Sequence, residues 1–317
     1  MAKNTKSARH HWWPECVSER WADAEGCVHW LSPAGAVKRI RPKNLGVIGN
    51  GHMIKLGAPD TPDSAWDENF EPQFDRADGA FPGIISWLES LTALPYVEGT
   101  PLLQRFLPQA VDDDRLAELS ECVVSLAVRS PNNRAGAVSL AEHLRGPLPP
   151  RERNALIGLN MRNTHRQAST AIADRAKFVV VFSPDREFIF GDGFFHNVRS
   201  PMNGMFLPQI FAPLTPRLAV LIVRTMSYRT EPKLTTLTIS ANETEAFNEA
   251  VQVYAKDAIF YRSDPPKVID AFTAGEHLVY SGANVMEQLI RSVPGIPPRD
   301  PNLDALRAAF ERRRAQG

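Results

Sequence analysis

The chain has few cysteines, no net charge and no long apolar run, and each absence excludes a class of protein. Its cysteines, Cys16, Cys27 and Cys122, are odd in number and lack Cys-x-x-Cys spacing, which excludes a disulfide framework and a thiolate zinc site. The 36 basic residues balance 36 acidic ones, so no overall field attracts nucleic acid or an anionic membrane. No stretch approaches the roughly 20 apolar residues that span a bilayer, and the polar N-terminus lacks a secretory signal. We therefore expect a cytoplasmic protein with no membrane partner.

The strong catalytic signatures are absent as well. The sequence contains no Gly-x-x-x-x-Gly-Lys-Ser/Thr, no Gly-x-Gly-x-x-Gly, no His-Glu-x-x-His and no Gly-x-Ser-x-Gly. These absences count against nucleoside triphosphate hydrolysis, dinucleotide redox chemistry, zincin proteolysis and α/β-hydrolase chemistry.

The composition supports one folded core with many short elements. Hydrophobic residues make up 43% of the 317 positions, and the 26 prolines predict frequent irregular connections. We expect a disordered leader over residues 1–9 and a single domain over residues 10–265. Residues 266–317 are expected to form a C-terminal extension with a terminal helix over residues 303–314.

Local patterns predict a small N-terminal β element followed by a helical middle. Residues 10–48 suggest a first turn or helix and then a hairpin around Ser32-Pro33-Ala34-Gly35. Apolar periodicity predicts helices over residues 84–94, 113–129 and 151–175. The second of these follows Asp112-Asp113-Asp114, which suits the dipole of a helix N-terminus.

The last third of the domain predicts antiparallel strands with a covering helix. Residues 178–182 form an apolar run whose expected hairpin partner is 187–190, and residues 218–223 and 234–239 supply further strands. Asn242 as N-cap and Glu245 at the third helical position predict a capping box that opens the covering helix. Because strands and helices are segregated along the chain, we expect an α+β fold.

The N-terminal region concentrates titratable, aromatic and rigid side chains in the run His10-His11-Trp12-Trp13-Pro14. Imidazole is the side chain whose ordinary pKa lies near physiological pH, so it suits general acid–base catalysis or metal ligation. We select His11 as the candidate; the alternative is a histidine that caps a turn or fills the core. We expect His10 to be a solvated neighbour and the tryptophans to be packing residues.

A series of short motifs occurs in a fixed order over residues 9 to 262. The motifs are His11-x-x-Pro14 with Trp21, Glu71 with Asp78, Arg129-Ser130-Pro131, Phe188-Ile189-Phe190-Gly191-Asp192, Pro213-Leu214-Thr215-Pro216, and Asn248. In this order they resemble an uncharacterised bacterial family catalogued as domain of unknown function 4238. The chain departs from the family pattern at Asp78, where Glu is commoner, and at Gly191, where Ser is usual. The family has no established activity, so the resemblance implies no reaction.

Two acidic residues of these motifs are candidate metal ligands. Glu71 and Asp78 are seven positions apart, so on one helix they would project from the same face about 10 Å apart. From there they can reach one divalent metal ion or one substrate from two sides. The alternative is a solvated acidic helix face.

Two further residues complete the candidate site. Arg129 ends an apolar helix face, where a guanidinium can clamp a phosphate or serve as a structural ion-pair partner. Asp192 follows an apolar strand and lies between two glycines, which suits a catalytic carboxylate at a strand end or an ordinary turn. Basic runs at 38–43 and 151–175 could line a phosphate-binding groove or form solvated faces.

These residue types favour a phosphodiesterase-type hydrolase, a nuclease acting on RNA or DNA in a toxin or phage-defence setting. His11 would be the general acid or base, Glu71, Asp78 and Asp192 would hold a metal ion or orient water, and Arg129 would stabilise phosphate charge. The alternative hypothesis is a non-catalytic sensor or protein-binding module whose Trp-rich N-terminus forms the interface.

Overall fold

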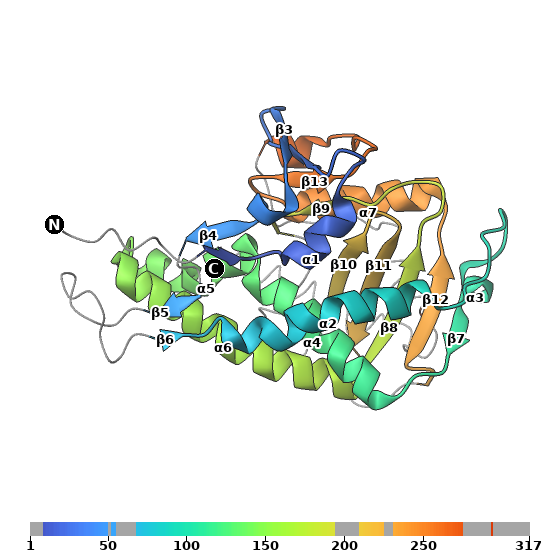
Figure 1. The fold of residues 1–317 in the computed structure, drawn as a ribbon, viewed down its shortest axis with the longest axis horizontal. Helices are drawn as coiled ribbons and strands as arrows, with labels where there is room; N and C mark the ends of the chain where they lie inside the picture. Colours follow the sequence, from blue (N-terminus) through green and yellow to red (C-terminus); the bar gives the residue numbers. More distant parts are fainter. Residues whose placement is uncertain are drawn as a thin grey trace, which may run out of the picture.

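The computed structural model describes residues 9–49, 52–54, 68–193, 209–224, 231–274 and 293, and its fold is α+β as predicted (Figure 1). Residues 1–8 of the predicted leader (1–9) and the predicted terminal helix over residues 303–314 lie outside the described residues, whereas Arg9 belongs to a strand. None of the helices in the described part of the chain has the length and apolar character needed to cross a bilayer.

A five-stranded sheet forms the centre of the molecule in the order β10-β11-β8-β12-β7 (Figure 1). The strands are β7 (Leu107–Gln109), β8 (Ala176–Phe182), β10 (Gln209–Thr215), β11 (Leu218–Arg224) and β12 (Leu234–Thr238). Neighbours are antiparallel except β8 and β12, which run parallel. Central strand β8 is apolar from Phe178 to Phe182, as is typical of a strand with both faces covered.

A second sheet has the order β3-β2-β13-β9. Its strands are β2 (Val28–Leu31), β3 (Val37–Ile40), β9 (Phe190–Gly191) and β13 (Ile259–Tyr261). The predicted β2–β3 hairpin is confirmed, with Gly35 at φ 80° in its turn. The predicted pairing of residues 178–182 with 187–190 is wrong. Both edges of β8 are occupied by β11 and β12, so the chain after β8 crosses to the second sheet instead.

Three long helices pack together on one side of the central sheet. They are α2 (Pro72–Glu89), α4 (Asp113–Arg129) and α6 (Pro150–Arg175). The last two turns of α4, Cys122 to Arg129, are buried on all sides, because α2 and α6 pack against this helix. The helix predicted over residues 113–129 has these bounds, whereas α2 begins well before residue 84. Pro131 ends α4 and also starts α5 (Pro131–Arg145), with Ser130 capping the new helix.

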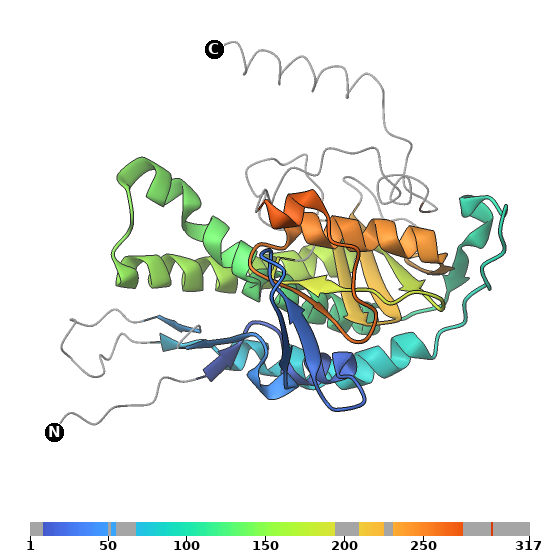
Figure 2. The same cartoon turned by 90° about the horizontal axis from the view of Figure 1, so that it is seen from above.

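Helix α7 (Ala241–Tyr254) lies on the opposite side of the sheet from α2 (Figure 2). The ring of its Phe247 stacks on Phe211 of β10, with centroids 4.5 Å apart. The predicted capping box exists, but two residues earlier: Ser240 is the N-cap and Glu243 the third helical residue. The segment contains two overlapping Ser/Asn-x-x-Glu patterns, and the sequence does not distinguish them.

Short elements connect these layers. They are β1 (Arg9–His11), α1 (Glu15–Ser18), η1 (Glu19–Trp21), η2 (Pro42–Asn44), β4 (Val47–Gly49), β5 (Met53–Ile54), β6 (Glu68–Asn69), α3 (Leu102–Arg105) and α8 (Asp270–Thr273). Strand β1 pairs with β4 and β5 pairs with β6, and β5 also contacts α6. These pairs bring the N-terminal histidines and His52 to the helical layer.

Candidate functional site

Polar side chains from two helices and a turn surround the buried ring of Phe74 on α2. The ring lies 5.2 Å from His52 and 5.2 Å from His165 of α6, centroid to centroid. The guanidinium carbon of Arg129 lies 4.7 Å from the same centroid. Because α2, α4 and α6 pack against one another, residues far apart in sequence meet at this ring.

Next to this ring, His10, His52 and Glu71 form a compact group. The backbone N–H of His52 donates to Nδ1 of His10 at 2.8 Å, and Nδ1 of His52 contacts a carboxylate oxygen of Glu71. The two imidazole planes lie within 12° of parallel, with centroids 5.0 Å apart. One ligand atom from each residue lies within 4.8 Å of the other two, so the group has the spacing of a metal site. The expectation that His10 is solvated is wrong, since only 4% of it is exposed.

Both histidines of the group are held in the uncharged form. Burial lowers the pKa of His52 to about 2, and the positive charge of Arg129 adds to this effect. Burial also lowers the pKa of His10, with a further contribution from Arg134. An uncharged imidazole offers a nitrogen lone pair, which ligation and proton acceptance both need.

Arg134 of α5 brings a second cation to the group. Its charge acts on both His10 and His52, and burial together with nearby Arg153 lowers its pKa to about 10. Its Nη1 lies 3.4 Å from the sulfur of Met161 on α6. A half-buried guanidinium beside imidazoles and a carboxylate suits the binding of a phosphate group.

His11, the histidine selected from the sequence, is half-buried on β1 beside the same group. Its Nδ1 lies 3.1 Å from the carbonyl oxygen of Leu45, which can only accept, so Nδ1 carries the hydrogen in the neutral ring. Nε2 then presents a lone pair. His11 is close enough to lower the pKa of His10 and His52.

Arg129 and Asp78 form a buried ion pair. The guanidinium donates to both carboxylate oxygens, at 2.9 and 2.6 Å, and also to the backbone and hydroxyl oxygens of Ser125. Arg129 is completely buried, whereas Asp78 is partly exposed. The structure therefore gives both residues structural partners: Asp78 faces Arg129 rather than joining Glu71, and Arg129 faces no solvent.

Asp192 lies in another part of the chain, directly after β9. Its carboxylate accepts the backbone N–H groups of Lys256 and Asp257 at 2.7 and 2.8 Å. Burial raises its pKa to about 6, although both hydrogen bonds favour the ionised form. The following Gly193 has no room for a side chain, because an added Cβ would lie 2.0 Å from the carbonyl oxygen of Tyr254. Asp192 thus closes a tight turn, and among the described residues its contacts do not include the His10–His52–Glu71 group.

The N-terminal tryptophans are core residues. Trp13 and Trp21 are fully buried and Trp12 nearly so, and Trp13 stacks on Phe190 with centroids 4.4 Å apart. The predicted packing role is confirmed, and the alternative of an interface formed by these indoles loses its basis. The first basic run is likewise engaged in part, since Arg39 pairs with Asp23 and Glu25.

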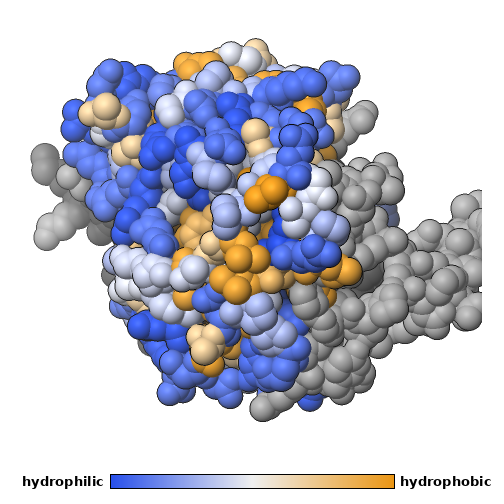
Figure 3. Space-filling model, turned by 90° about the vertical axis from the view of Figure 1, so that its right-hand side faces the viewer, coloured by the Kyte–Doolittle hydropathy of each residue, from blue (hydrophilic) through white to orange (hydrophobic). Residues whose placement is uncertain are grey.

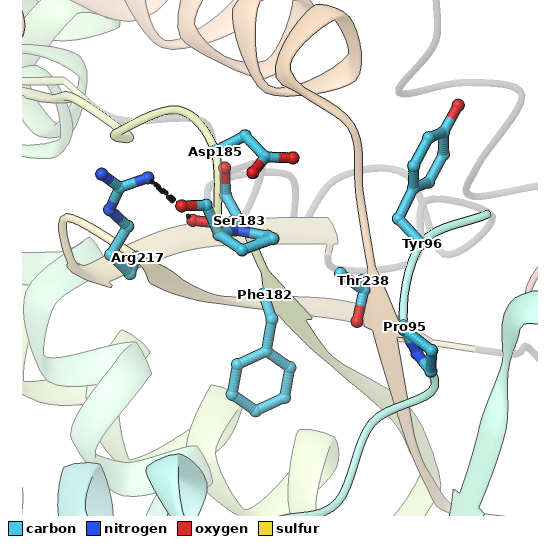
Figure 4. Close-up of a pocket in the computed structure, with 8 residues that line it drawn as sticks. Pro95, Tyr96, Phe182, Ser183, Asp185, Arg217 and Thr238 are labelled. Atoms are coloured by element: carbon cyan, nitrogen blue, oxygen red, sulfur yellow. Dashed lines mark hydrogen bonds between the residues drawn. The ribbon is translucent and has the colours of Figure 1, made fainter. Parts of the chain in front are cut away.

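An open cleft of about 500 Å³ lies elsewhere, at one end of the central sheet (Figure 4). Pro95, Tyr96, Phe182, Ser183, Arg217 and Thr238 are among its lining residues. Arg217 donates to the carbonyl oxygens of Ser183 and Pro184, so its donors serve the turn after β8. The cleft contains none of the residues selected from the sequence.

The same end of the molecule carries an exposed apolar surface. Leu94, Val97 and Leu103 are exposed and belong to α3 and the loop before it. Figure 3 shows apolar atoms in the middle of this face, bordered by hydrophilic ones. This surface is well separated along the sheet from the β1–β5 region that holds the histidines (Figure 1).

Sequence reasoning found Glu71 and His11 but missed His10, His52, His165 and Arg134. His52 lies in a glycine-rich segment with no periodic pattern, and His165 and Arg134 lie among many other polar helical residues. Only tertiary packing reveals that these positions meet.

No family model, no curated protein and no solved structure matches the chain. The resemblance to domain of unknown function 4238 therefore stays a prediction from the order of the motifs.

Proposed function

We propose that the protein is a cytoplasmic phosphodiesterase-type hydrolase that acts on RNA or DNA. One observation carries the proposal: His10, His52 and Glu71 are in mutual contact, and the charges of Arg134 and His11 act on both buried histidines. Cleavage of a phosphodiester needs a group that activates water and a cation that stabilises negative charge on phosphate. This part of the molecule supplies both kinds of group.

The roles follow from the contacts. His11 accepts a proton through Nε2, because its Nδ1 is engaged by the carbonyl of Leu45. Glu71, whose side chain is 28% exposed, is the carboxylate of the group that reaches solvent and orients the water. Arg134 takes the role that the sequence suggested for Arg129, since Arg129 is fully engaged by Asp78.

The test is cleavage of labelled oligonucleotides by the purified full chain. Single-stranded RNA, single-stranded DNA and duplex DNA are incubated with wild type and with His11→Ala, Glu71→Gln and Arg134→Gln. A general acid or base contributes about 10²–10⁴-fold, so we expect a loss of at least 10²-fold for His11→Ala. His143→Ala, an exposed histidine of α5, is the matched control and should keep wild-type activity.

Two results would contradict the proposal. One is the absence of cleavage of all three substrates by folded wild type; the other is unchanged cleavage by both His11→Ala and Glu71→Gln. Expression of the same variants in bacteria addresses the toxin or phage-defence setting. Wild type should slow growth and degrade nucleic acid, whereas cells that express His11→Ala should grow normally and keep their nucleic acid intact.

A further inference from the structure

We propose that His10, His52 and Glu71 bind one divalent first-row transition-metal ion. This inference deepens the proposed function and rests on it for the ion's catalytic purpose, but the binding site itself stands on separate observations. Two imidazole nitrogens and one carboxylate oxygen lie mutually within 4.8 Å. Catalytic zinc sites are built from three such protein ligands, with a fourth position left for water.

The ligand atoms of the group are close enough to converge on one ion after small side-chain movements. Metal–nitrogen bonds are about 2.0–2.1 Å long, so donors on one tetrahedral ion lie about 3.4 Å apart, whereas the three ligand atoms here lie within 4.8 Å of one another. The rings of His10 and His52 are stacked, with planes 12° apart, so one ring must rotate for both lone pairs to point at the ion. Glu71 already contacts Nδ1 of His52, so a carboxylate oxygen and an imidazole nitrogen of the proposed ligand set face each other.

The ring of His52 is also supported by its surroundings. Nδ1 of His10 accepts the amide hydrogen of His52, so this nitrogen carries a lone pair. Phe70 and Phe74 pack against the ring of His52, with centroids at 5.6 and 5.2 Å. Fixed ligands in apolar surroundings lose little conformational freedom on binding, as the supporting contacts of metal sites generally ensure.

The ligand types select the kind of ion. Imidazole nitrogen suits Zn²⁺, Fe²⁺, Co²⁺ and Cu²⁺, whereas Mg²⁺ and Ca²⁺ prefer oxygen ligands throughout. Both histidines are buried, whereas the Glu71 side chain is partly exposed. The coordination position left open for water would therefore lie on the side of the carboxylate. A water bound there is what the proposed hydrolase would activate.

The experiment measures binding of Zn²⁺ and Co²⁺ to the chelator-stripped full chain by calorimetry and elemental analysis. We expect one ion per chain and at least about a 10²-fold loss of affinity in Glu71→Gln. Removal of a residue that only supports a ligand already lowers metal affinity by about 10–100-fold, and loss of a ligand should cost at least as much. Because His52 is buried, binding by His52→Ala is compared only if its circular dichroism spectrum and melting temperature match those of wild type. Glu71→Gln keeps the fold more readily, because the Glu71 side chain is partly exposed and glutamine has nearly the same shape. Mg²⁺ should bind far more weakly than Zn²⁺.

The controls separate this site from the cysteines and from the proposed activity. Cys16→Ser and His143→Ala should bind the ion as wild type does, and the Co²⁺ spectrum should lack thiolate absorption. Absence of binding, or binding that persists in Glu71→Gln and is lost in Cys16→Ser, would overturn the inference. An ion bound without cleavage of any oligonucleotide would overturn the proposed function alone. Cleavage that resists full chelation would overturn the catalytic purpose of the ion alone.

Discussion

Replacement of Arg129 by alanine is expected to lower the free energy of unfolding by about 3–5 kcal/mol. The guanidinium is completely buried, donates to both oxygens of Asp78 and lies against the ring of Phe74. Its removal leaves the Asp78 carboxylate without its partner and opens a cavity between α2 and α4. Since whole domains are stable by only about 5–15 kcal/mol, the variant should be severely destabilised.

Urea unfolding of the purified protein measures this loss. Arg145→Ala is the matched control, because its pair with Glu152 is exposed and such pairs contribute about 0–1 kcal/mol. If Arg129→Ala does not fold, Asp78→Asn tests the same pair from its partly exposed side and keeps the shape. A loss below about 1 kcal/mol in either variant would show that the pair is not a structural bond, and would reopen a functional role for Arg129.

Replacement of Trp21 by alanine is expected to cost about 3–5 kcal/mol of stability. The indole is fully buried, packs its edge on Phe190 with centroids 4.7 Å apart, and donates from Nε1 to the carbonyl of Leu214 at 3.2 Å. The substitution removes a large apolar volume and also leaves the Leu214 carbonyl without this donor, which adds to the cost.

Thermal and urea unfolding again provide the measurement. Trp21→Phe should lose less, since it fills much of the volume, and Trp30→Ala should lose less because Trp30 is only half-buried on the outer hairpin. Near-wild-type stability of Trp21→Ala would contradict the core assignment. It would favour the alternative in which the N-terminal indoles form an interface for a partner.

Local signals were sufficient for the helices whose ends carry clear chemistry. The acidic run before α4 places Asp112 as its N-cap, where the side chain accepts the N–H of Arg115. The partners of β8 were not predictable in the same way. Its neighbour β12 runs parallel to it from more than fifty positions later in the chain, and pairing of that kind leaves no pattern in either strand.

The candidate site shows the same division. Glu71 could be selected because it belongs to an ordered series of motifs, and Asp78 because it follows on the same helix face. Which of the two meets histidines is decided by the β5–β6 pair, which carries His52 to the start of α2. Asp192 had the right surroundings in sequence, glycines on both sides, but Gly193 makes room for the carbonyl oxygen of Tyr254 and Gly191 lies against the side chain of Ala255.

In the proposed phosphodiesterase, an ion held by His10, His52 and Glu71 works together with His11 and Arg134. The direct measurement is a crystal structure with Zn²⁺ and a non-hydrolysable dinucleotide, with anomalous data at the zinc edge. We expect a single strong peak about 2.0–2.2 Å from one atom of each of the three ligands, with a phosphate oxygen between the ion and Arg134. A peak at other ligands, or a dinucleotide bound in the cleft beside Arg217 with no ion at the histidines, would contradict this expectation.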